Sequence, residues 1–311
     1  LQEVGIKTQS GHIGCQEAIH TLRTILSTRR HHGLSTYALF IDLVKAFDSV
    51  EHETLYAVLR KYGLPSNLVN VIKKMYSKSR IKIEIGSEQR FVDYKMGVQQ
   101  GHNMAPLLFL FIMQAAMDTL EDKLTSKLEF RYHKAQADPS KQCGRLIGQD
   151  TKSKGTILSI NNLLYVDDGA FLFADREAID HAAETIVNHF EKFGLTVHTR
   201  TSKSKSKTEA VFFPPALKVT EETTNELPSE IELTQNRHIH FTNTFKYLGS
   251  IISSDLKDDL EIEIRIKRAW QQMGALKHFW DCKDADLITK YWVYLSGPLN
   301  TLLWASESWS L

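Results

Sequence analysis

The segment LLYVDDGAFLFA, residues 163–174, sets two adjacent aspartates, Asp167 and Asp168, and Gly169 between two short apolar runs. Such runs on either side of a turn predict two strands joined as a hairpin. Because Asp-Gly is a favoured hairpin-turn dipeptide, an ordinary turn explains the segment by itself. Two carboxylates about 4 Å apart, however, repel by roughly 1 kcal/mol in water and about 4 kcal/mol at an effective dielectric near 20. A half-buried pair favours a bound cation, so the segment alone leaves turn and metal site open.

A further carboxylate, Asp42, closes the apolar strand predicted over Tyr37–Ile41. If this strand lies beside the hairpin in an antiparallel sheet, Asp42, Asp167 and Asp168 converge at one edge. Oxygen ligands suit Mg²⁺ or Mn²⁺, and two such ions can activate an attacking hydroxyl and stabilise a leaving phosphate. The arrangement points to phosphoryl or nucleotidyl transfer. A strand-end acid without a catalytic role is the alternative for Asp42.

Hydrophobic periodicity predicts helices and hairpins around these strands. Asp48 and Glu51 match a capping box, which predicts a helix running to Gly63. Asp175 is the expected cap of a helix that ends at Gly194. Further helices are predicted over 66–76, 104–124, 256–279 and 284–303, hairpins over 81–98 and 245–253, and a strand over 208–213.

This order of elements predicts an α+β fold, a ferredoxin-like antiparallel sheet with helices on one face. Residues 131–154 are polar and predict an inserted loop or exposed hairpin, and residues 216–237 a mobile acidic excursion. The last two helices predict a separate small bundle, with a core that includes Trp270, Trp280, Trp292 and Trp304.

The overall composition is that of an ordinary globular protein, with 42% hydrophobic and 24% charged residues. A net charge of +1 gives no global attraction to nucleic acid, so any polyanion site must come from local clusters of Lys and Arg. Three widely spaced cysteines argue against a disulfide framework and favour a reducing, intracellular compartment. The longest apolar stretch is too short to span a bilayer, so no membrane partner is expected.

Five segments of the chain follow one another in an order that carries more than any one of them: ALFIDLVKAFDSV (38–50), GVQQGHNMAPLLF (97–109), LLYVDDGAFLF (163–173), GLTVHTRTSKSKSKTEAVFF (194–213) and FKYLGSII (245–252). They resemble, in order, the first catalytic motif, the template-gripping motif, the paired-aspartate motif, the fourth motif and the primer grip of the reverse transcriptase domain of LINE-type (non-LTR) retrotransposons. LLWASESW (302–309) resembles the end of that family's thumb.

The resemblance covers essentially the whole chain and implies a right-hand polymerase with a ferredoxin-like palm, partial fingers and a helical thumb. The implied activity is that of an RNA-directed DNA polymerase, which uses an RNA template, a DNA primer and dNTPs, and a nuclear location is expected. The expected domains are fingers over 1–36 and 63–96, truncated at the N-terminus, palm over 37–62 and 97–253, and thumb over 254–311.

The resemblance also implies roles for individual residues. Asp42, Asp167, Asp168 and the main-chain carbonyl of Leu43 would bind two Mg²⁺ or Mn²⁺ ions. Lys207 would protonate the pyrophosphate leaving group, for which an ammonium is suited because it both neutralises and protonates. Lys203 and Lys205 lie close enough to leave this register open.

Nucleotide binding is implied at two segments. Lys45 and Ala46 would lie against the triphosphate, the alanine through its backbone N–H. Phe47 would be a steric gate, because a flat ring beneath the sugar leaves no room for a 2′-hydroxyl. Gln100 and Gly101 would contact the nucleotide and the template.

Basic clusters and the primer grip are the expected contacts to the primer-template duplex, giving sequence-independent, salt-sensitive binding. A solvated charged face is the alternative for the basic residues. The expected contacts are Lys73, Lys74, Arg80 and Lys82 of the fingers, Tyr247, Leu248 and Gly249 of the primer grip, and Arg265, Lys267 and Arg268 of the first thumb helix.

The sequence departs from the family pattern at His102–Ala105. It also departs at Val166, a position at which LINE enzymes usually have Ala. The arginine that normally grips the triphosphate is matched at best by Lys7. Two alternatives stay open: a group II intron-type reverse transcriptase, and a decayed or domesticated copy that binds nucleic acid without polymerising. The oligomeric state is not predicted.

Overall fold

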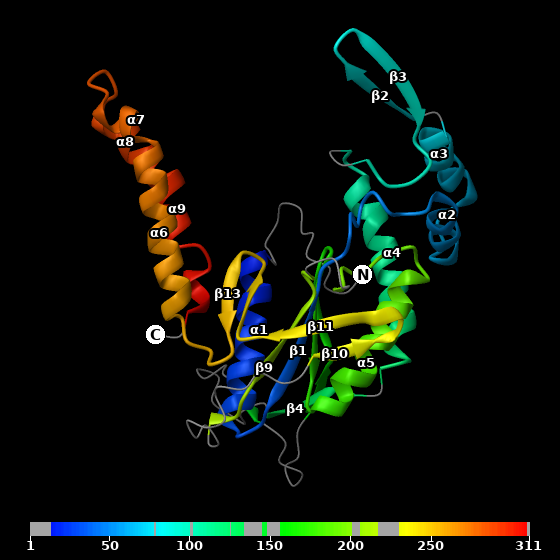
Figure 1. The fold of residues 1–311 in the computed structure, drawn as a ribbon, viewed down its shortest axis with the longest axis horizontal. Helices are drawn as coiled ribbons and strands as arrows, with labels where there is room; N and C mark the ends of the chain where they lie inside the picture. Colours follow the sequence, from blue (N-terminus) through cyan, green and yellow to red (C-terminus); the bar gives the residue numbers. More distant parts are fainter. Residues whose placement is uncertain are drawn as a thin grey trace.

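The core of the fold is a six-stranded mixed sheet in the order β10-β11-β9-β1-β8-β7 (Figure 1). The computed structural model describes residues 14–77, 79–99, 102–124, 126–133, 145–147, 156–200, 206–216 and 230–309. β1 runs antiparallel to β8 and β9, whereas β11 runs parallel to β9. The strands are β1 (Thr36–Ile41), β7 (Asn162–Tyr165), β8 (Asp168–Phe173), β9 (Glu209–Phe213), β10 (Ile231–Leu233) and β11 (Arg237–Thr242).

Helices cover both faces of this sheet, so the expected one-sided arrangement is wrong. Side chains alternate along a strand. Leu39 and Ile41 of β1 pack in one buried cluster with α4 and α5, while Ala38 and Phe40 pack in a second with α1. Because both sides of the central strands are apolar, each side needs a helical cover. The covering helices are α1 (Cys15–His31), α4 (Ala105–Glu121) and α5 (Arg176–Glu191).

Strands occur in or beside both irregular regions expected from the sequence. At the expected insertion, predicted as a loop or an exposed hairpin, β5 pairs with β4, and β4 also pairs with β6 just beyond it, in a separate three-stranded sheet. The described end of the expected excursion, residues 230–237, adds β10 to the edge of the central sheet. Ile231 and Leu233 are buried there, which explains why this part is ordered as a strand. The additional elements are β4 (Leu128–His133), β5 (Arg145–Ile147), β6 (Thr156–Ile160) and the short helix η3 (Thr234–Asn236).

Two arms rise from the same side of the sheet in Figure 1. One arm ends in an exposed hairpin with the predicted period-two strands. The other is helical and follows a second hairpin, also as predicted. The first arm contains α2 (His52–Lys61), α3 (Ser66–Ser77), β2 (Arg80–Ile85) and β3 (Glu88–Asp93), and the second contains β12 (Thr244–Tyr247), β13 (Ser250–Ser253), α6 (Asp259–Ala275), α7 (Lys277–Asp281), α8 (Leu287–Tyr294), η4 (Leu295–Leu299) and α9 (Asn300–Leu302).

The tryptophans of the helical arm do not form the expected common core. Trp270 is 70% exposed and Trp292 63% exposed, whereas Trp304 packs against the cluster beneath α1. Few helices surround this arm, so the apolar faces of α6 and α8 are only partly covered. Among the described residues, no helix combines the length and the apolar character needed to cross a bilayer.

The chain between β1 and α2 forms a turn, not the expected helix start. Residues 44–49 are turns and α2 begins at His52, with Glu51 as its N-cap residue, so Asp48 does not cap it. Val98 N–H donates to the Phe47 carbonyl at 2.8 Å and Gly97 N–H to the Val50 carbonyl at 2.7 Å. These bonds compete with helix formation. The expected cap of α5 is confirmed, because the Asp175 side chain accepts the Ala178 N–H at 2.8 Å.

Gly97 makes this close approach possible. Its φ of +91° suits glycine, and a Cβ there would lie 2.9 Å from Asp48 Cα and 2.7 Å from Tyr94 Oη. Gly63 also has a positive φ, +81°, but nothing lies within 4 Å of its Cβ position.

Gly97→Ala is therefore expected to destabilise the protein more than Gly63→Ala does. Both substitutions place a Cβ in the left-handed region, at a cost of about 1–2 kcal/mol, but only Gly97→Ala adds a backbone clash. Urea unfolding of the two variants measures the difference. Equal losses of unfolding free energy would contradict the close approach.

Candidate active site at the β1–β8 edge

Asp42 and Asp168 lie opposite each other, at the end of two neighbouring strands in the central sheet. Ile41 pairs with Gly169, so the next residues along β1 and back along β8 are Asp42 and Asp168. The main chain at Asp42 is held on its other side: its N–H donates to Thr208 Oγ1 at 3.1 Å, and its carbonyl accepts the His198 N–H at 2.8 Å. The predicted convergence of these two carboxylates is what the register produces.

The hairpin turn is formed by Val166 and Asp167, because Tyr165 pairs with Asp168. The interpretation of Asp-Gly as the turn is therefore wrong: Asp168 and Gly169 are both in β8. Val166 has a φ of +59°, an unfavourable conformation for a β-branched residue. Such strain persists only where the surroundings hold it, and it is frequent at functional sites.

A pocket of about 440 Å³ opens beside the two carboxylates. We call it the carboxylate pocket. Its walls come from β1, β8, β9 and the β12 strand, so segments far apart in the sequence meet there. It is lined by Phe40, Ile41, Asp42, Asp168, Gly169, Ser206, Lys207, Glu209, Phe245, Lys246 and Tyr247.

The electrostatics of the carboxylate pocket favour a cation. Burial, together with the negative charges of Asp167 and Asp42, raises the pKa of Asp168 to about 6. A carboxyl whose charged form is disfavoured by two neighbouring acids lacks a compensating positive charge. A divalent ion would supply that charge, so the donor chemistry fits a metal.

The carboxylates are nevertheless not gathered around one point. Within the described part of the chain, no three His, Cys, Asp or Glu side chains are placed to hold a metal ion. Asp42 Oδ2 instead lies 3.8 Å from Lys207 Nζ, in a weak pair because Lys207 is largely exposed. Of the predicted metal ligands, Asp42 and Asp168 thus face each other, but no third described carboxylate joins them around one point.

The turn after Asp42 leaves several backbone groups without a hydrogen bond from the described residues. No described residue hydrogen-bonds to the Leu43 carbonyl or to the N–H groups of Ala46 and Phe47. Lys45 has a φ of +47°, and successive free N–H groups beside such a residue form a concavity suited to anions. The half-buried Phe47 ring stacks on Phe109 with centroids 4.6 Å apart.

The matching family model, reverse transcriptase (RNA-dependent DNA polymerase), covers residues 8–252. The chain belongs to the reverse transcriptase family. This confirms the resemblance that the motif order carries.

Relatives of this reverse transcriptase domain are polyproteins of R2 elements. It is 25% identical over 266 residues to the "Retrovirus-related Pol polyprotein from type-1 retrotransposable element R2" of Nasonia vitripennis, an alignment that covers 84% of this chain and 22% of that protein. It is 30% identical over 117 residues to the "Retrovirus-related Pol polyprotein from type-2 retrotransposable element R2DM" of Drosophila melanogaster, which covers 37% of this chain and 11% of that protein. The chain therefore spans less than a quarter of either relative, and the similarity to R2 polyproteins supports the LINE-type resemblance.

Among solved structures, the domain is similar to an apo telomerase from Candida tropicalis, with a TM-score of 0.44 and 13% identity over 77% of this chain and 38% of that one. A telomerase from Candida albicans, solved with a fragment of telomeric RNA, gives a TM-score of 0.42 and 14% identity over 94% of this chain and 41% of that one.

Some of the expected site residues fall outside the described part of the reverse transcriptase domain. Gln100 and Gly101 do, although Gly97 and Val98 just before them are bonded to the turn that bears Phe47. Lys7, Lys203 and Lys205 do as well. Of the three lysines in the Lys-Ser run, Lys207 is the one that the structure describes beside Asp42.

The basic residues of the first arm are exposed, and three of the four have acidic neighbours. Lys73 pairs with Glu53 at 2.9 Å, Arg80 with Asp93 at 3.2 Å and Lys82 with Glu84 at 2.5 Å. Such exposed pairs are weak, so the cations stay available to a polyanion. The fourth residue is the exposed Lys74.

The expected primer-grip and thumb contacts differ in exposure. Tyr247 is only 2% exposed and Arg265 only 5%, and Arg265 is hydrogen-bonded within the protein. Neither side chain is free to touch a duplex, so the structure does not support Arg265 as a phosphate contact. Lys267 is exposed and Arg268 half-buried, both on α6.

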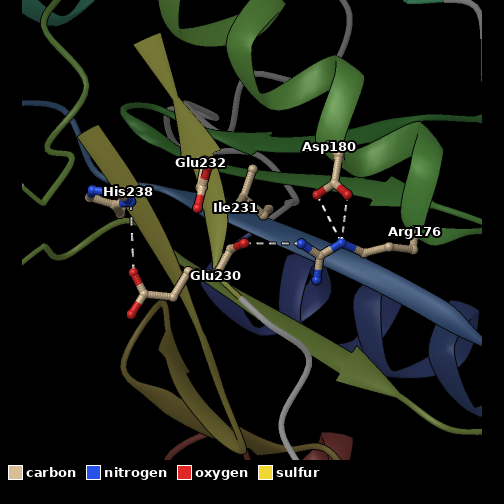
Figure 2. Close-up of a pocket in the computed structure, with 6 residues that line it drawn as sticks. All are labelled: Arg176, Asp180, Glu230, Ile231, Glu232 and His238. Carbon is tan, nitrogen blue, oxygen red and sulfur yellow. Dashed lines mark hydrogen bonds and ion pairs between the residues drawn. The ribbon is translucent and has the colours of Figure 1, made fainter. Parts of the chain in front are cut away.

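A further pocket of about 560 Å³ lies away from the carboxylates, between α5 and β10 (Figure 2). Four of its lining residues are bonded or paired with one another: Arg176, Asp180, Glu230 and His238. Arg176 Nε lies 2.7 Å from Asp180 Oδ2, and Arg176 Nη2 donates to the Glu230 carbonyl at 3.1 Å. This internal pairing marks a structural contact that fastens β10 to the sheet.

Two residues were missed from the sequence: Phe245, which lines the carboxylate pocket, and Thr208, which supports it from outside the lining. Thr208 is fully buried and fixes the Asp42 main chain, and Phe245 stacks on Phe40 with centroids 4.2 Å apart. A threonine between a lysine and an acid gives no sequence signal. The aromatic Phe245 at the start of the primer-grip motif could have been noted as a partner for a β1 aromatic.

Asp168→Asn is expected to stabilise the metal-free protein at pH 7.5 by about 2 kcal/mol. Folding raises the Asp168 pKa to about 6, so ionised Asp168 costs stability above pH 6, and this cost disappears as the pH falls below about 4. Urea unfolding with a chelator at pH 7.5 and pH 4 measures the effect. An Asn variant that is no more stable than the parent at pH 7.5 would contradict this electrostatic picture.

Proposed function

We propose that this chain is the RNA-directed DNA polymerase domain of a retroelement, adding dNTPs to a DNA primer on an RNA template. The observation that carries the proposal is the facing pair Asp42 and Asp168, with the pKa of Asp168 raised by burial and by the negative charges of Asp167 and Asp42. Membership of the reverse transcriptase family supports it.

Asp42, Asp167, Asp168 and the Leu43 carbonyl would hold two Mg²⁺ or Mn²⁺ ions. When bound, such ions activate the primer 3′-hydroxyl for attack on the α-phosphate and neutralise the departing pyrophosphate. The Leu43 carbonyl is free of hydrogen bonds from described residues, as a ligand must be. The Lys207 ammonium then exchanges its weak pair with Asp42 for the pyrophosphate, to which it gives a proton.

The incoming nucleotide would lie over the turn after Asp42. The N–H groups of Ala46 and Phe47, which bond to no described residue, would donate to the triphosphate, with the exposed Lys45 beside them. Phe47 is held by Phe109 and would exclude a 2′-hydroxyl. Gln100 and Gly101 would complete this side of the site.

The two arms would grip the duplex. We assign residues 63–96 to the fingers and 254–311 to the thumb, with Lys73, Lys74, Arg80, Lys82, Lys267 and Arg268 as exposed or partly exposed phosphate contacts. Binding through such cations is independent of sequence and weakens with salt.

Primer extension on an RNA template with Mg²⁺ or Mn²⁺ tests the activity. We expect the parent chain to extend, and Asp42→Asn, Asp167→Asn and Asp168→Asn each to lower the rate by about 10³-fold or more, because each removes charge at the reacting phosphate. Asp122→Asn, at an exposed position at the end of α4, is the matched control and should extend normally. If the parent binds duplex but does not extend the primer, and the three variants behave in the same way, the chain is a decayed or domesticated copy and the proposed activity is refuted.

The role of Phe47 is tested by sugar selection. Phe47→Ala is expected to lower the preference for dNTP over NTP by about 10- to 100-fold, because the 2′-hydroxyl then fits. The measurement is kcat/KM for each nucleotide, with Phe91→Ala on exposed β3 as the control. A parent that uses NTPs as readily as dNTPs would refute the gate.

A further inference from the structure

The turn of the β12–β13 hairpin is strained and close to the carboxylate pocket. Leu248 and Gly249 form a two-residue loop between the paired Tyr247 and Ser250, with φ values of +47° and +88°. A type I′ turn requires positive φ at both positions, which glycine accepts and leucine resists. A strained leucine persists only if its surroundings fix the turn.

Helix α6 holds the turn from one side through a buried ion pair. Glu261 Oε2 accepts the Ile251 N–H at 2.8 Å, and Glu261 Oε1 accepts from Arg265 Nε at 2.7 Å. Arg265 Nη2 in turn donates to the Gly249 carbonyl. Glu261 is 1% exposed and Arg265 5% exposed, so both charged groups are buried and interact with protein groups instead of solvent. The pair binds the backbone on both sides of Ser250.

Trp304 and the sheet hold the turn from the other sides. A Cβ on Gly249 would lie 3.3 Å from Trp304 Nε1, so the indole lies directly against the turn. The Tyr247 ring, beside the turn, lies 5.7 Å from the Phe40 ring of β1. Phe40 is two residues before Asp42, so the turn is fixed relative to the strand that carries the catalytic candidate.

A second ion pair holds strand β13 close to the turn. Arg23 of α1 pairs with Asp258, just before α6, and its Nη2 donates to the Ile251 carbonyl at 3.1 Å. Since α1 packs on the central sheet, α6, the hairpin and the sheet are tied together at this point. Arg265 is therefore connected to the turn through buried contacts, so a substitution at Arg265 is expected to displace the turn.

We propose that Arg265 is a positioning residue and not a phosphate contact. Together with Glu261 it fixes the Leu248–Gly249 turn beside the carboxylate pocket. That turn determines the position of the primer 3′-hydroxyl. This rests on the proposed polymerase function. Tyr247 and Lys246 beside the turn line the pocket together with Asp42 and Asp168. A displacement of about 1 Å at a reacting group can cost about 10²-fold in rate. Loss of the Arg265 fork acts on the chemical step and not on duplex affinity.

Arg265→Lys tests this role, because lysine keeps the charge but cannot bond Glu261 and the Gly249 carbonyl in the same fork. We expect the single-turnover extension rate on saturating duplex to fall by about 10-fold or more. The duplex Kd and its salt dependence should stay within about twofold of the parent. Arg60→Lys, the same change at an exposed position of α2, should alter none of these values.

Arg265→Lys that weakens duplex binding and its salt dependence while leaving the rate unchanged would overturn the proposal in favour of a phosphate contact. If Arg265→Lys does not fold, Gly249→Ala displaces the same turn against Trp304 without touching a charge. It should reproduce the loss of rate, and an unchanged rate refutes the positioning role. A parent that does not extend refutes the proposed function itself, whereas an active parent with unaffected variants refutes only the role of Arg265.

Discussion

The antiparallel pairing of β1 with β8, in the register that sets Ile41 opposite Gly169, is the constraint on which the site depends. A shift by one residue would send Asp42 and every buried side chain of β1 to the opposite face. Helices on both sides of the sheet enforce the register, since Leu39 and Ile41 must meet α4 and α5 while Phe40 meets α1. The packing of the core thus decides where the carboxylates lie.

The candidate site is strained and electrostatically incomplete. Val166, at a turn of the central sheet, and Leu248, at the turn of the separate β12–β13 hairpin, both have positive φ values, and Asp168 has a raised pKa. These features are unfavourable in the protein by itself, and the proposed cation and nucleic acid would offset their cost. Stability comes from the two apolar clusters on either side, and the buried pairs Glu261–Arg265 and Arg23–Asp258 fix the nearby hairpin.

The sequence was most informative where a pattern is local. The alternation in 81–85, the cap at Asp175 and the strand ending in Asp42 are confirmed, because side-chain period and capping depend on near neighbours. It failed where tertiary contacts decide. The second helical cover by α1 and the burial of Arg265 depend on distant segments, while Asp-Gly turn propensity was overridden by strand register. The exposure of Trp270 reflects a face of α6 that the described chain leaves uncovered.

We propose that Asp42 and Asp168 share one cation site that strand register creates. Titration of Mn²⁺ into the chain, with free Mn²⁺ counted by electron paramagnetic resonance, tests it without any polymerisation. We expect saturable binding to the parent, weakened about tenfold or more by either Asp42→Asn or Asp168→Asn, with no further large loss in the double variant because the two residues act on the same ion. Unchanged binding in both single variants would contradict it.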